Sequence, residues 1–315
     1  MEKWRVILTD GLDDIGIELL KKEAEVANRK GITAEELIQE IGEYQAIIVR
    51  GRTKVTREVI AAAKNLKVIG RSGVGVDNID LAAAEEKGIV VVNAPTSTST
   101  AVAELAMGLI FALSREIPRA DATMKNGEWI KKELMGAELN GKVLGILGFG
   151  RIGSMVGRMA AAVGMQILAY DVFPITETVH GIGGEPASID ELIEKSDVIT
   201  IHTPLTDQTR NMIDAGAISR MKDGVYIVCT ARGGIIDEKA LLDALNSGKV
   251  SGAGLDVFST EPPIDMELIK HPRVVATPHV GGQTIAAQIR ASRDIAEEVL
   301  AGLRGDQLRW KVTKN

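Results

Sequence analysis

The feature that most constrains the fold of this chain is the alternation of short apolar runs with helix-period segments along nearly its whole length of 315 residues. Runs such as RVILTD (5–10) and KVLGILG (142–148) are rich in Val, Ile and Leu. Near-continuous apolar runs of this length are typical of strands buried on both faces of a parallel sheet. Strands that alternate with helices form βαβ units with right-handed crossovers. The sequence therefore predicts an α/β fold of doubly wound parallel sheets.

The predicted strands are too many for one compact sheet and fall into two series. The first series has strands at 5–10, 45–50, 66–71 and 89–95, with helix-like stretches at 33–41, 56–65 and 79–88. The second has strands at 142–148, 165–171, 197–204, 224–230, 252–258 and 274–278, with helix-like stretches at 151–164, 188–196 and 237–248. A long helical stretch at about 98–140 separates the two series. The last helix-like stretch, 284–305, has no predicted strand after it, and periodicity leaves open whether it returns to the first domain.

Charge and cysteine content exclude several classes of protein. With 37 basic and 43 acidic side chains, the formal charge of −6 gives no broad attraction for nucleic acid or an anionic membrane. The single cysteine, Cys229, excludes an intrachain disulfide and a cysteine-cluster metal site. The N-terminus has no apolar signal-peptide core, and no apolar stretch reaches the ~20 residues that a membrane span needs. We expect a cytoplasmic protein with no metal, no nucleic-acid partner and no membrane partner.

One glycine-rich segment has the spacing of a dinucleotide-binding loop. Gly148, Gly150 and Gly153 form a GxGxxG pattern that follows a predicted strand and opens a predicted helix, which is the context the motif requires. The first glycine permits a tight turn, the second lets the backbone approach a pyrophosphate, and the third lets helix and strand pack closely. Arg151 lies within the loop and is placed to contact the pyrophosphate. The alternative is a glycine-rich turn without a ligand.

An acidic residue after the next strand strengthens this interpretation. Asp171 follows the apolar run MQILAYD and lies about 20 residues beyond the glycines, where a carboxylate binds the ribose 2′-hydroxyl. A carboxylate there would repel a 2′-phosphate. The pattern therefore favours NAD over NADP.

Three charged or titratable side chains directly follow strands of the second series. Arg232 stands in CTARGGIID, Glu261 in LDVFSTEPP and His279 in ATPHVGG. Chemistry in open α/β sheets gathers at the carboxyl ends of strands. Taken singly, they have ordinary alternatives, namely a turn arginine, a solvated loop charge and a core histidine.

Together these residue types fit a dehydrogenase acting on a 2-hydroxy or 2-oxo acid. An arginine fork can hold the substrate carboxylate in bidentate fashion. A histidine can exchange a proton with the substrate oxygen near neutral pH. A glutamate paired with that histidine raises its pKa and keeps it protonated for reduction.

The segments GFGRIG, HTPLTDQTRNMI, CTARGGIIDEKAL, GAGLDVFSTEPP and TPHVGGQT resemble the D-isomer-specific 2-hydroxyacid dehydrogenase family over nearly the whole chain. The resemblance implies two Rossmann-like, doubly wound parallel-sheet domains with a cleft between them. It implies a flavodoxin-like substrate-binding domain at 1–97 plus 284–315 and an NAD-binding Rossmann domain at 98–283. It also implies a homodimer or a higher homo-oligomer.

The resemblance assigns roles to particular residues. His279 is implied as the acid/base, Glu261 as its partner and Arg232 as the residue that orients the substrate, while Asp256 would meet the nicotinamide carboxamide. The residues implied to bind NAD are Val74, Gly148, Gly150, Arg151, Ile152, Gly153, Asp171, His202, Thr203, Pro204, Thr230, Ala231, Asp256, Gly281 and Gly282.

Within the family, the chain most resembles members that oxidise 3-phospho-D-glycerate to 3-phosphohydroxypyruvate with NAD, in serine biosynthesis. A phosphorylated substrate needs further cations. The candidates are Arg50, Arg52, Lys54, Arg71, Lys131 and Lys132, and the loop of Ser72 and Gly73 is a candidate for backbone contacts to the substrate carboxylate. The alternative is that these are ordinary surface charges. Because the sequence stops at Asn315, the regulatory C-terminal domain of many such members is not expected.

Two other functions stay open at this point. The first is a hydroxypyruvate or glyoxylate reductase, or another D-2-hydroxyacid dehydrogenase. The second, from a different class, is an NAD(H)-sensing binding protein similar to a co-repressor, against which Arg232, Glu261 and His279 argue.

Overall fold

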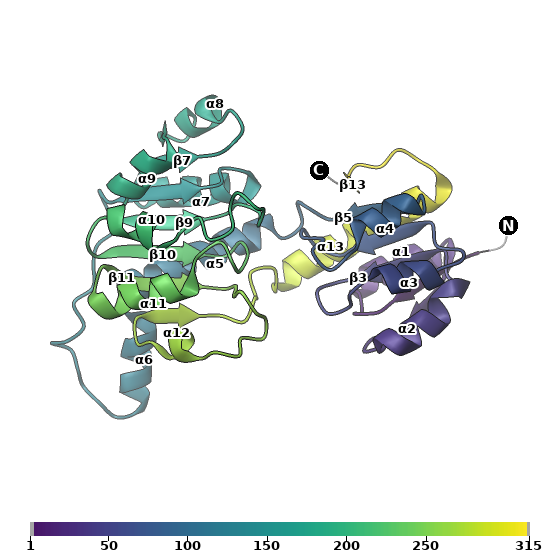
Figure 1. Cartoon of the computed structure of the whole chain (residues 1–315), viewed down its shortest axis with the longest axis horizontal. Helices are drawn as coiled ribbons and strands as arrows, with labels where there is room; N and C mark the ends of the chain where they lie inside the picture. The colour runs from purple at the N-terminus through teal and green to yellow at the C-terminus, as the bar shows by residue number, and fades with distance from the viewer. Residues whose placement is uncertain (1–2, 314–315) are drawn as a thin grey trace. The chain divides into compact units, whose positions relative to one another are not determined.

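A computed structural model describes residues 3–313 of the chain, which form two compact units (Figure 1). Unit 1 comprises Met1–Thr98 and Gly282–Asn315, and unit 2 comprises Ser99–Gly281. Each is an α/β sandwich, so the predicted fold class is confirmed. The predicted domain boundaries lie one or two residues from those of the units. Within residues 3–313, no helix combines the length and apolarity needed to cross a membrane.

The sheet of unit 1 has six strands in the order β13-β5-β4-β3-β1-β2. The strands are β1 (Trp4–Leu8), β2 (Ala24–Asn28), β3 (Ala46–Val49), β4 (Val68–Arg71), β5 (Val90–Asn93) and β13 (Lys311–Val312). All pairings are parallel except that of β13 with β5. The carboxyl ends of β1, β3 and β4 therefore lie along one edge.

Helices cover both faces of this sheet. They are α1 (Asp14–Lys21), α2 (Ala34–Glu40), α3 (Arg57–Ala62), α4 (Leu81–Glu86) and α13 (Ile285–Arg304), with a short 3-10 turn at Ile41–Glu43. Alternate strand residues serve the two faces, so that Ile7 packs with α2 to α4 while Val6 and Leu8 pack with α1 and α13. Helix α13 begins at the N-cap Thr284 and ends at Gly305 in the left-handed conformation. It crosses β4 so closely that a side chain at Gly70 would meet Val299.

Three elements of unit 1 depart from the sequence prediction. Strand β13 follows the final helix, where no strand was predicted, and it adds one antiparallel edge to the sheet. Strand β2 and helix α1 were not predicted either. Strand β2 is an edge strand with the sequence AEVAN, which has too few large apolar residues to give a strand signal.

The sheet of unit 2 has seven parallel strands in the order β12-β11-β10-β9-β6-β7-β8. They are β6 (Val143–Leu147), β7 (Gln166–Tyr170), β8 (Glu185–Pro186), β9 (Val198–Ile201), β10 (Val225–Cys229), β11 (Val250–Leu255) and β12 (Val274–Ala276). The chain runs outward from β6 in both directions, so the strand order reverses between β6 and β9. Such a switch point opens a crevice at the carboxyl ends of the strands.

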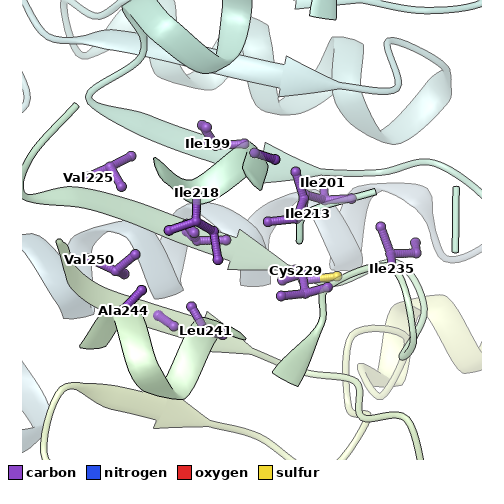
Figure 2. Close-up of a cluster of buried hydrophobic side chains, with 14 of the residues drawn as sticks. Ile199, Ile201, Ile213, Ile218, Val225, Cys229, Ile235, Leu241, Ala244 and Val250 are labelled. Carbon is purple, nitrogen blue, oxygen red and sulfur yellow. The ribbon is translucent and has the colours of Figure 1, made fainter. Parts of the chain in front are cut away.

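Two apolar clusters lie on opposite faces of this sheet. The helices are α5 (Ser99–Ser114), α6 (Ile117–Lys125), α7 (Arg151–Ala162), α8 (Thr176–His180), α9 (Ile189–Lys195), α10 (Ala215–Arg220), α11 (Glu238–Ser247) and α12 (Glu267–Lys270). Helices α5 and α7 cover one face and α9 to α11 the other. Figure 2 shows the second cluster, in which Ile199 of β9 lies near Ile218 of α10, Ile201 of β9 lies near Ile213, and Cys229 stands at the end of β10.

The long helical stretch predicted at about 98–140 is shorter than expected and broken. Helix α5 ends at Ser114, and Glu116 takes the left-handed conformation with φ 49° before α6 begins. Helix α6 ends at Lys125, and Gly127 has φ 79° just beyond it. Residues 126–141 then contain turns and irregular chain. The charged and apolar residues of this segment recur at the spacing of a helix. The left-handed backbone at Glu116 and Gly127 nevertheless interrupts the hydrogen bonds that would continue one helix.

Candidate active site

The loop between β6 and α7 carries the predicted glycines, and each meets a different constraint. Gly148 has φ 91°, and a Cβ there would lie 2.7 Å from the carbonyl carbon of His202. A Cβ at Gly153 would lie 2.1 Å from the carbonyl oxygen of Gly148, so only glycine fits this contact between helix and loop. Around Gly150, the N-cap of α7, a Cβ would meet no described heavy atom within 4 Å. The loop is thus tightly packed at Gly148 and Gly153 and has open space at Gly150.

Asp171 follows β7 and is tied to this glycine loop. Its Oδ2 accepts the backbone N–H of Phe149 at 2.8 Å, and its Oδ1 accepts that of Phe173 at 3.1 Å. Each carboxylate oxygen has a second lone-pair site. The side chain is therefore oriented by the loop and retains acceptor capacity for a ribose hydroxyl.

The ends of β9 and β10 carry buried polar atoms that lack partners. Among residues 3–313, Thr203 Oγ1, Thr230 Oγ1 and His202 Nδ1 are buried without a hydrogen bond. His202 Nε2 lies 2.9 Å from Thr200 Oγ1, and burial lowers the pKa of His202 to about 3, so the imidazole is neutral. Buried polar groups without partners are rare in folded proteins and indicate a missing ligand or water.

These observations fit a dinucleotide. The helix N-terminus of α7 offers backbone N–H groups for a pyrophosphate, the opening at Gly150 admits it, and the two threonine hydroxyls offer donors and acceptors. Arg151 and Ile152 form the first turn of α7. The carbonyls of Pro204 and Ala231 already accept hydrogen bonds from Thr209 Oγ1 and Arg232 Nη1.

His279 and Glu261 form a direct pair in unit 2. His279 Nδ1 lies 2.7 Å from Glu261 Oε2, and Glu261 Oε1 accepts the backbone N–H of Phe258 at 3.1 Å. His279 has φ 52°, a conformation held by hydrogen bonds from its backbone N–H to the carbonyls of Asp256 and Thr277. With Nδ1 engaged, Nε2 is the ring nitrogen left for a substrate.

The pair shifts the pKa values of both members. The hydrogen bond with Glu261 is the main cause that raises the pKa of His279, against the opposing effect of burial. Burial on its own raises the pKa of Glu261, but the hydrogen bonds from His279 and Phe258 outweigh it and lower that pKa. Glu261 is therefore an anion that stabilises the protonated imidazole, as an acid/base pair requires.

Arg232 lies close to this pair. Its positive charge acts to lower the pKa of both Glu261 and His279. The following Gly233 packs so tightly that a Cβ there would lie 1.9 Å from the carbonyl oxygen of Phe258, three residues before Glu261. The structure thus brings together all three side chains singled out as a catalytic group.

Asp256, expected to meet the nicotinamide carboxamide, also has partners within the protein. Its side chain is 1% exposed, and its Oδ1 accepts Thr277 Oγ1 at 2.6 Å and the N–H of Val280 at 2.8 Å. Its Oδ2 accepts the N–H of Gly281 at 2.9 Å. The carboxylate therefore holds the loop that carries His279. Sequence reasoning missed this network, although Thr277 stands in the same motif as His279.

Cys229 is buried at the end of β10, where burial raises the pKa of its thiol to about 11. Its Sγ lies 3.7 Å from the carbonyl oxygen of Arg232. A protonated, buried thiol is a poor nucleophile, so Cys229 packs beneath the arginine loop.

The remaining predicted residues lie mostly in unit 1. Arg50 follows β3, and Ser72 and Gly73 follow the neighbouring β4. Arg71 Nη1 donates to the carbonyl of Ser72 at 2.9 Å and occupies the space that a side chain at Gly73 would need. Val74 and Gly282 use their carbonyls to accept hydrogen bonds from Asn93 and Gln288. Lys131 lies in unit 2, exposed in the segment after α6.

Comparison with known proteins defines the family. Residues 107–281 match the model of the D-isomer specific 2-hydroxyacid dehydrogenase, NAD binding domain, which corresponds to nearly all of unit 2. The chain belongs to the D-isomer specific 2-hydroxyacid dehydrogenase family, and unit 2 is its NAD-binding domain.

Several named relatives cover nearly the whole chain. It is 48% identical to a D-3-phosphoglycerate dehydrogenase of Methanocaldococcus jannaschii over 96% of the chain, but it spans only 58% of that relative. It is 47% identical to a hydroxypyruvate reductase of Thermotoga maritima over 96% of the chain and 99% of the relative. A D-lactate dehydrogenase of Aquifex aeolicus, solved with NAD and lactic acid, is 33% identical, with a TM-score of 0.85 over 96% of each chain.

Proposed function

We propose that this protein catalyses NAD-dependent oxidation of a D-2-hydroxy acid to the 2-oxo acid, and the reverse reduction. The observation that carries this proposal is the 2.7 Å hydrogen bond between His279 Nδ1 and Glu261 Oε2, with the charge of Arg232 nearby. A histidine that can exchange a proton, beside a cation, suits a substrate that carries both a hydroxyl and a carboxylate. The NAD-binding family of unit 2 supports the same class of reaction.

In the oxidation, His279 Nε2 accepts the proton of the substrate hydroxyl. When bound, NAD would accept the hydride, which is the hydrogen with its electron pair, from the carbon that carries the hydroxyl, and this C–O bond becomes a carbonyl. The resulting imidazolium is stabilised by Glu261 through the hydrogen bond to Nδ1. Arg232 binds the substrate carboxylate and fixes which face of the carbon is presented. In the reduction, the protonated His279 returns the proton to the oxygen.

Most of the proposed cofactor contacts lie in unit 2, and Val74 and Gly282 lie in unit 1. Gly150, Arg151 and Ile152 at the start of α7 would hold the pyrophosphate, and Asp171 the ribose. We assign the remaining cofactor contacts to the following residues: Val74, Gly148, Gly153, His202, Thr203, Pro204, Thr230, Ala231, Asp256, Gly281 and Gly282. Unit 1, with Gly282–Asn315, is proposed as the substrate-binding domain.

We propose 3-phospho-D-glycerate and 3-phosphohydroxypyruvate as the substrate pair, which places the protein in serine biosynthesis. Support comes from curated D-3-phosphoglycerate dehydrogenases that are 42–48% identical to this chain. The phosphate requires cations beyond Arg232, and we assign Arg50, Arg71 and Lys131, with the loop of Ser72 and Gly73, to substrate binding.

A second candidate is hydroxypyruvate reduction. The specific observation in its favour is the Thermotoga maritima reductase, of which the chain covers 99%. Both candidates use the same acid/base pair and differ only in the phosphate.

The test is NADH consumption with 3-phosphohydroxypyruvate beside hydroxypyruvate, glyoxylate and pyruvate. The proposal expects the highest kcat/KM with the phosphorylated acid. A higher kcat/KM with hydroxypyruvate would favour the second candidate, and no turnover with any 2-oxo acid would contradict the dehydrogenase activity itself.

We further propose a homodimer or higher homo-oligomer in the cytoplasm. Four large apolar side chains on and after α6 support self-association, because their exposed fractions are 52% for Ile117, 57% for Met124, 77% for Trp129 and 82% for Met135. Light scattering should give at least twice the monomer mass of 33.7 kDa. Cell fractionation tests the location.

A further inference from the structure

Two arginines on the loop after β3 have opposite surroundings. Arg52 donates from Nη1 to the carbonyl of Ile32 at 3.1 Å and from Nη2 to that of Thr9 at 2.7 Å, and its Nε lies 3.1 Å from Asp10 Oδ1. Its guanidinium is therefore engaged by the protein on all three nitrogens. In residues 3–313, the guanidinium of Arg50 has one hydrogen bond, a long one of 3.4 Å to Gln283 Oε1. Arg50 is thus the arginine of this loop whose charge is available to a ligand.

The backbone around Arg50 is held on both sides by two side chains from other elements. Asp10 Oδ2 accepts the N–H of Arg50 at 2.7 Å and that of Thr53 at 3.1 Å. Asn78 Nδ2 donates to the carbonyl of Arg50 at 2.9 Å and to that of Thr53 at 2.6 Å. The same two side chains therefore hold the N–H and the carbonyl of both residues, which fixes the turn between them.

The chemistry of Asp10 explains why a carboxylate stands there. Its side chain is 5% exposed, and its two oxygens receive the N–H groups of Arg50 and Thr53, the hydroxyl of Thr53 at 2.6 Å and the Nε of Arg52. A carboxylate is the side chain with enough acceptor sites and no donor to receive four such groups. A buried carboxylate is stable only when paired and hydrogen-bonded, and Arg52 supplies the paired charge.

We propose that Asp10 and Asn78 are positioning residues that hold Arg50 ready to bind the phosphate of the substrate. This inference rests on the proposed phosphorylated substrate. Ordering a flexible arginine on binding costs conformational entropy, and a backbone already fixed at both N–H and carbonyl reduces that cost. Asp10 and Asn78 act through Arg50 and do not themselves touch the substrate. Arg52, whose side chain is half exposed, is the cation that pairs with the buried Asp10.

The experiment measures kcat and KM for NADH-dependent reduction of 3-phosphohydroxypyruvate and of hydroxypyruvate in the full chain. Asp10→Asn keeps the shape of the side chain but replaces one carboxylate oxygen by an NH2 group. This group cannot accept the hydrogen bonds that Asp10 accepts from Arg50 and Thr53. We expect the kcat/KM ratio of phosphorylated over unphosphorylated acid to fall about tenfold, mainly through KM for the phosphorylated acid, as expected for a misplaced binding group. Arg50→Ala should lower the same ratio by about 10–100-fold, through loss of a charge-assisted hydrogen bond.

The controls separate positioning from stability. The double variant Asp10→Asn/Arg50→Ala should have the ratio of Arg50→Ala alone, because Asp10 acts through Arg50. The matched control Asp14→Asn, an exposed aspartate in α1, should leave the ratio unchanged. If Asp10→Asn does not fold, Asn78→Ala, which removes the two hydrogen bonds to the carbonyls, should give the same selective rise in KM.

Three contrary results have different meanings. A preference for the phosphorylated acid that Arg50→Ala abolishes but Asp10→Asn and Asn78→Ala preserve would overturn this inference and leave the proposed function intact. Equal losses with both substrates would also overturn it, since a structural role predicts them. No preference in the unmodified protein would overturn both the phosphorylated substrate and the inference drawn from it.

Discussion

The carboxyl edges of the two sheets use the same device to present different groups. In unit 2, the buried Asp256 after β11 accepts backbone N–H groups from the loop that carries His279. In unit 1, the buried Asp10 after β1 accepts backbone N–H groups from the loop that carries Arg50. Each carboxylate is almost completely buried and fixes a neighbouring loop.

The difference lies in what each loop presents. The unit 2 loop presents a titratable imidazole paired with Glu261, and the unit 1 loop presents an arginine with a permanent charge. A proton-transfer group needs a partner that tunes its pKa, whereas an anion-binding group needs only its position. Under the proposed function, the comparison assigns proton transfer to unit 2 and binding of the substrate phosphate by Arg50 to unit 1.

The largest expected effect is that of His279→Ala. Removing the proton carrier should lower kcat by about 10²–10⁴-fold, the usual contribution of general acid–base catalysis. The pyrophosphate and ribose contacts proposed for NAD lie elsewhere in unit 2, so NADH should still bind in a fluorescence titration. Turnover near that of the unmodified protein would show that another group moves the proton.

Arg232→Lys tests whether Arg232 binds the substrate carboxylate through two nitrogens of its guanidinium group. Lysine keeps the charge but cannot hold a carboxylate in bidentate fashion. We expect kcat/KM for every 2-oxo acid to fall about 10–100-fold, from loss of one charge-assisted hydrogen bond. Steady-state kinetics with hydroxypyruvate and 3-phosphohydroxypyruvate measure this, and a loss confined to the phosphorylated acid would instead assign Arg232 to the phosphate.

Two glycines of the unit 2 loop should separate stability from cofactor binding. Gly153→Ala places a Cβ 2.1 Å from a backbone oxygen. It should lower the free energy of unfolding by about 1–3 kcal/mol and also weaken NADH binding. Gly150→Ala meets no described atom and should weaken NADH binding with little change in stability. Urea unfolding and NADH titration measure both.

Gly108→Ala is the control, since its Cβ would also meet open space and it lies in α5, away from the loop. It should leave NADH affinity unchanged. If Gly150→Ala also left NADH affinity unchanged, the pyrophosphate would not approach this glycine.

The smallest expected effect is a change in pH dependence. The pKa of His279 is raised above its ordinary 6.5 by the hydrogen bond with Glu261. Reduction needs the protonated imidazole, so kcat/KM for reduction should have its highest value at low pH and fall as the pH rises through that pKa. In Glu261→Gln the carboxylate charge is lost, and the fall should move to lower pH. A pH–rate profile in the same position would contradict the pairing.

Much of unit 2 could be predicted because its residues follow strong patterns. The glycine spacing at Gly148, Gly150 and Gly153 implies a strand-to-helix turn, and Arg232, Glu261 and His279 each follow a strand run. The orienting roles of Asp256 and Asp10 could not be read, because they depend on which backbone N–H groups face each carboxylate. That is a property of loop geometry rather than of spacing.

The failures in secondary structure have similar causes. Strand β2 lies at the edge of its sheet, where a strand can contain many polar residues, and β13 is a two-residue antiparallel strand. The helical period after Lys125 is broken by left-handed backbone at Gly127, which side-chain periodicity does not register. Arg50 and Arg52 have equal charge in the sequence, and only their hydrogen bonds distinguish them.

The most direct test of the division between the units compares His279→Ala with Arg50→Ala on both substrates. We expect His279→Ala to lower kcat/KM for 3-phosphohydroxypyruvate and hydroxypyruvate by similar factors, so that their ratio is preserved. Arg50→Ala should lower the ratio, because only one substrate carries the phosphate. A ratio that changes in His279→Ala and is preserved in Arg50→Ala would contradict this division between the units.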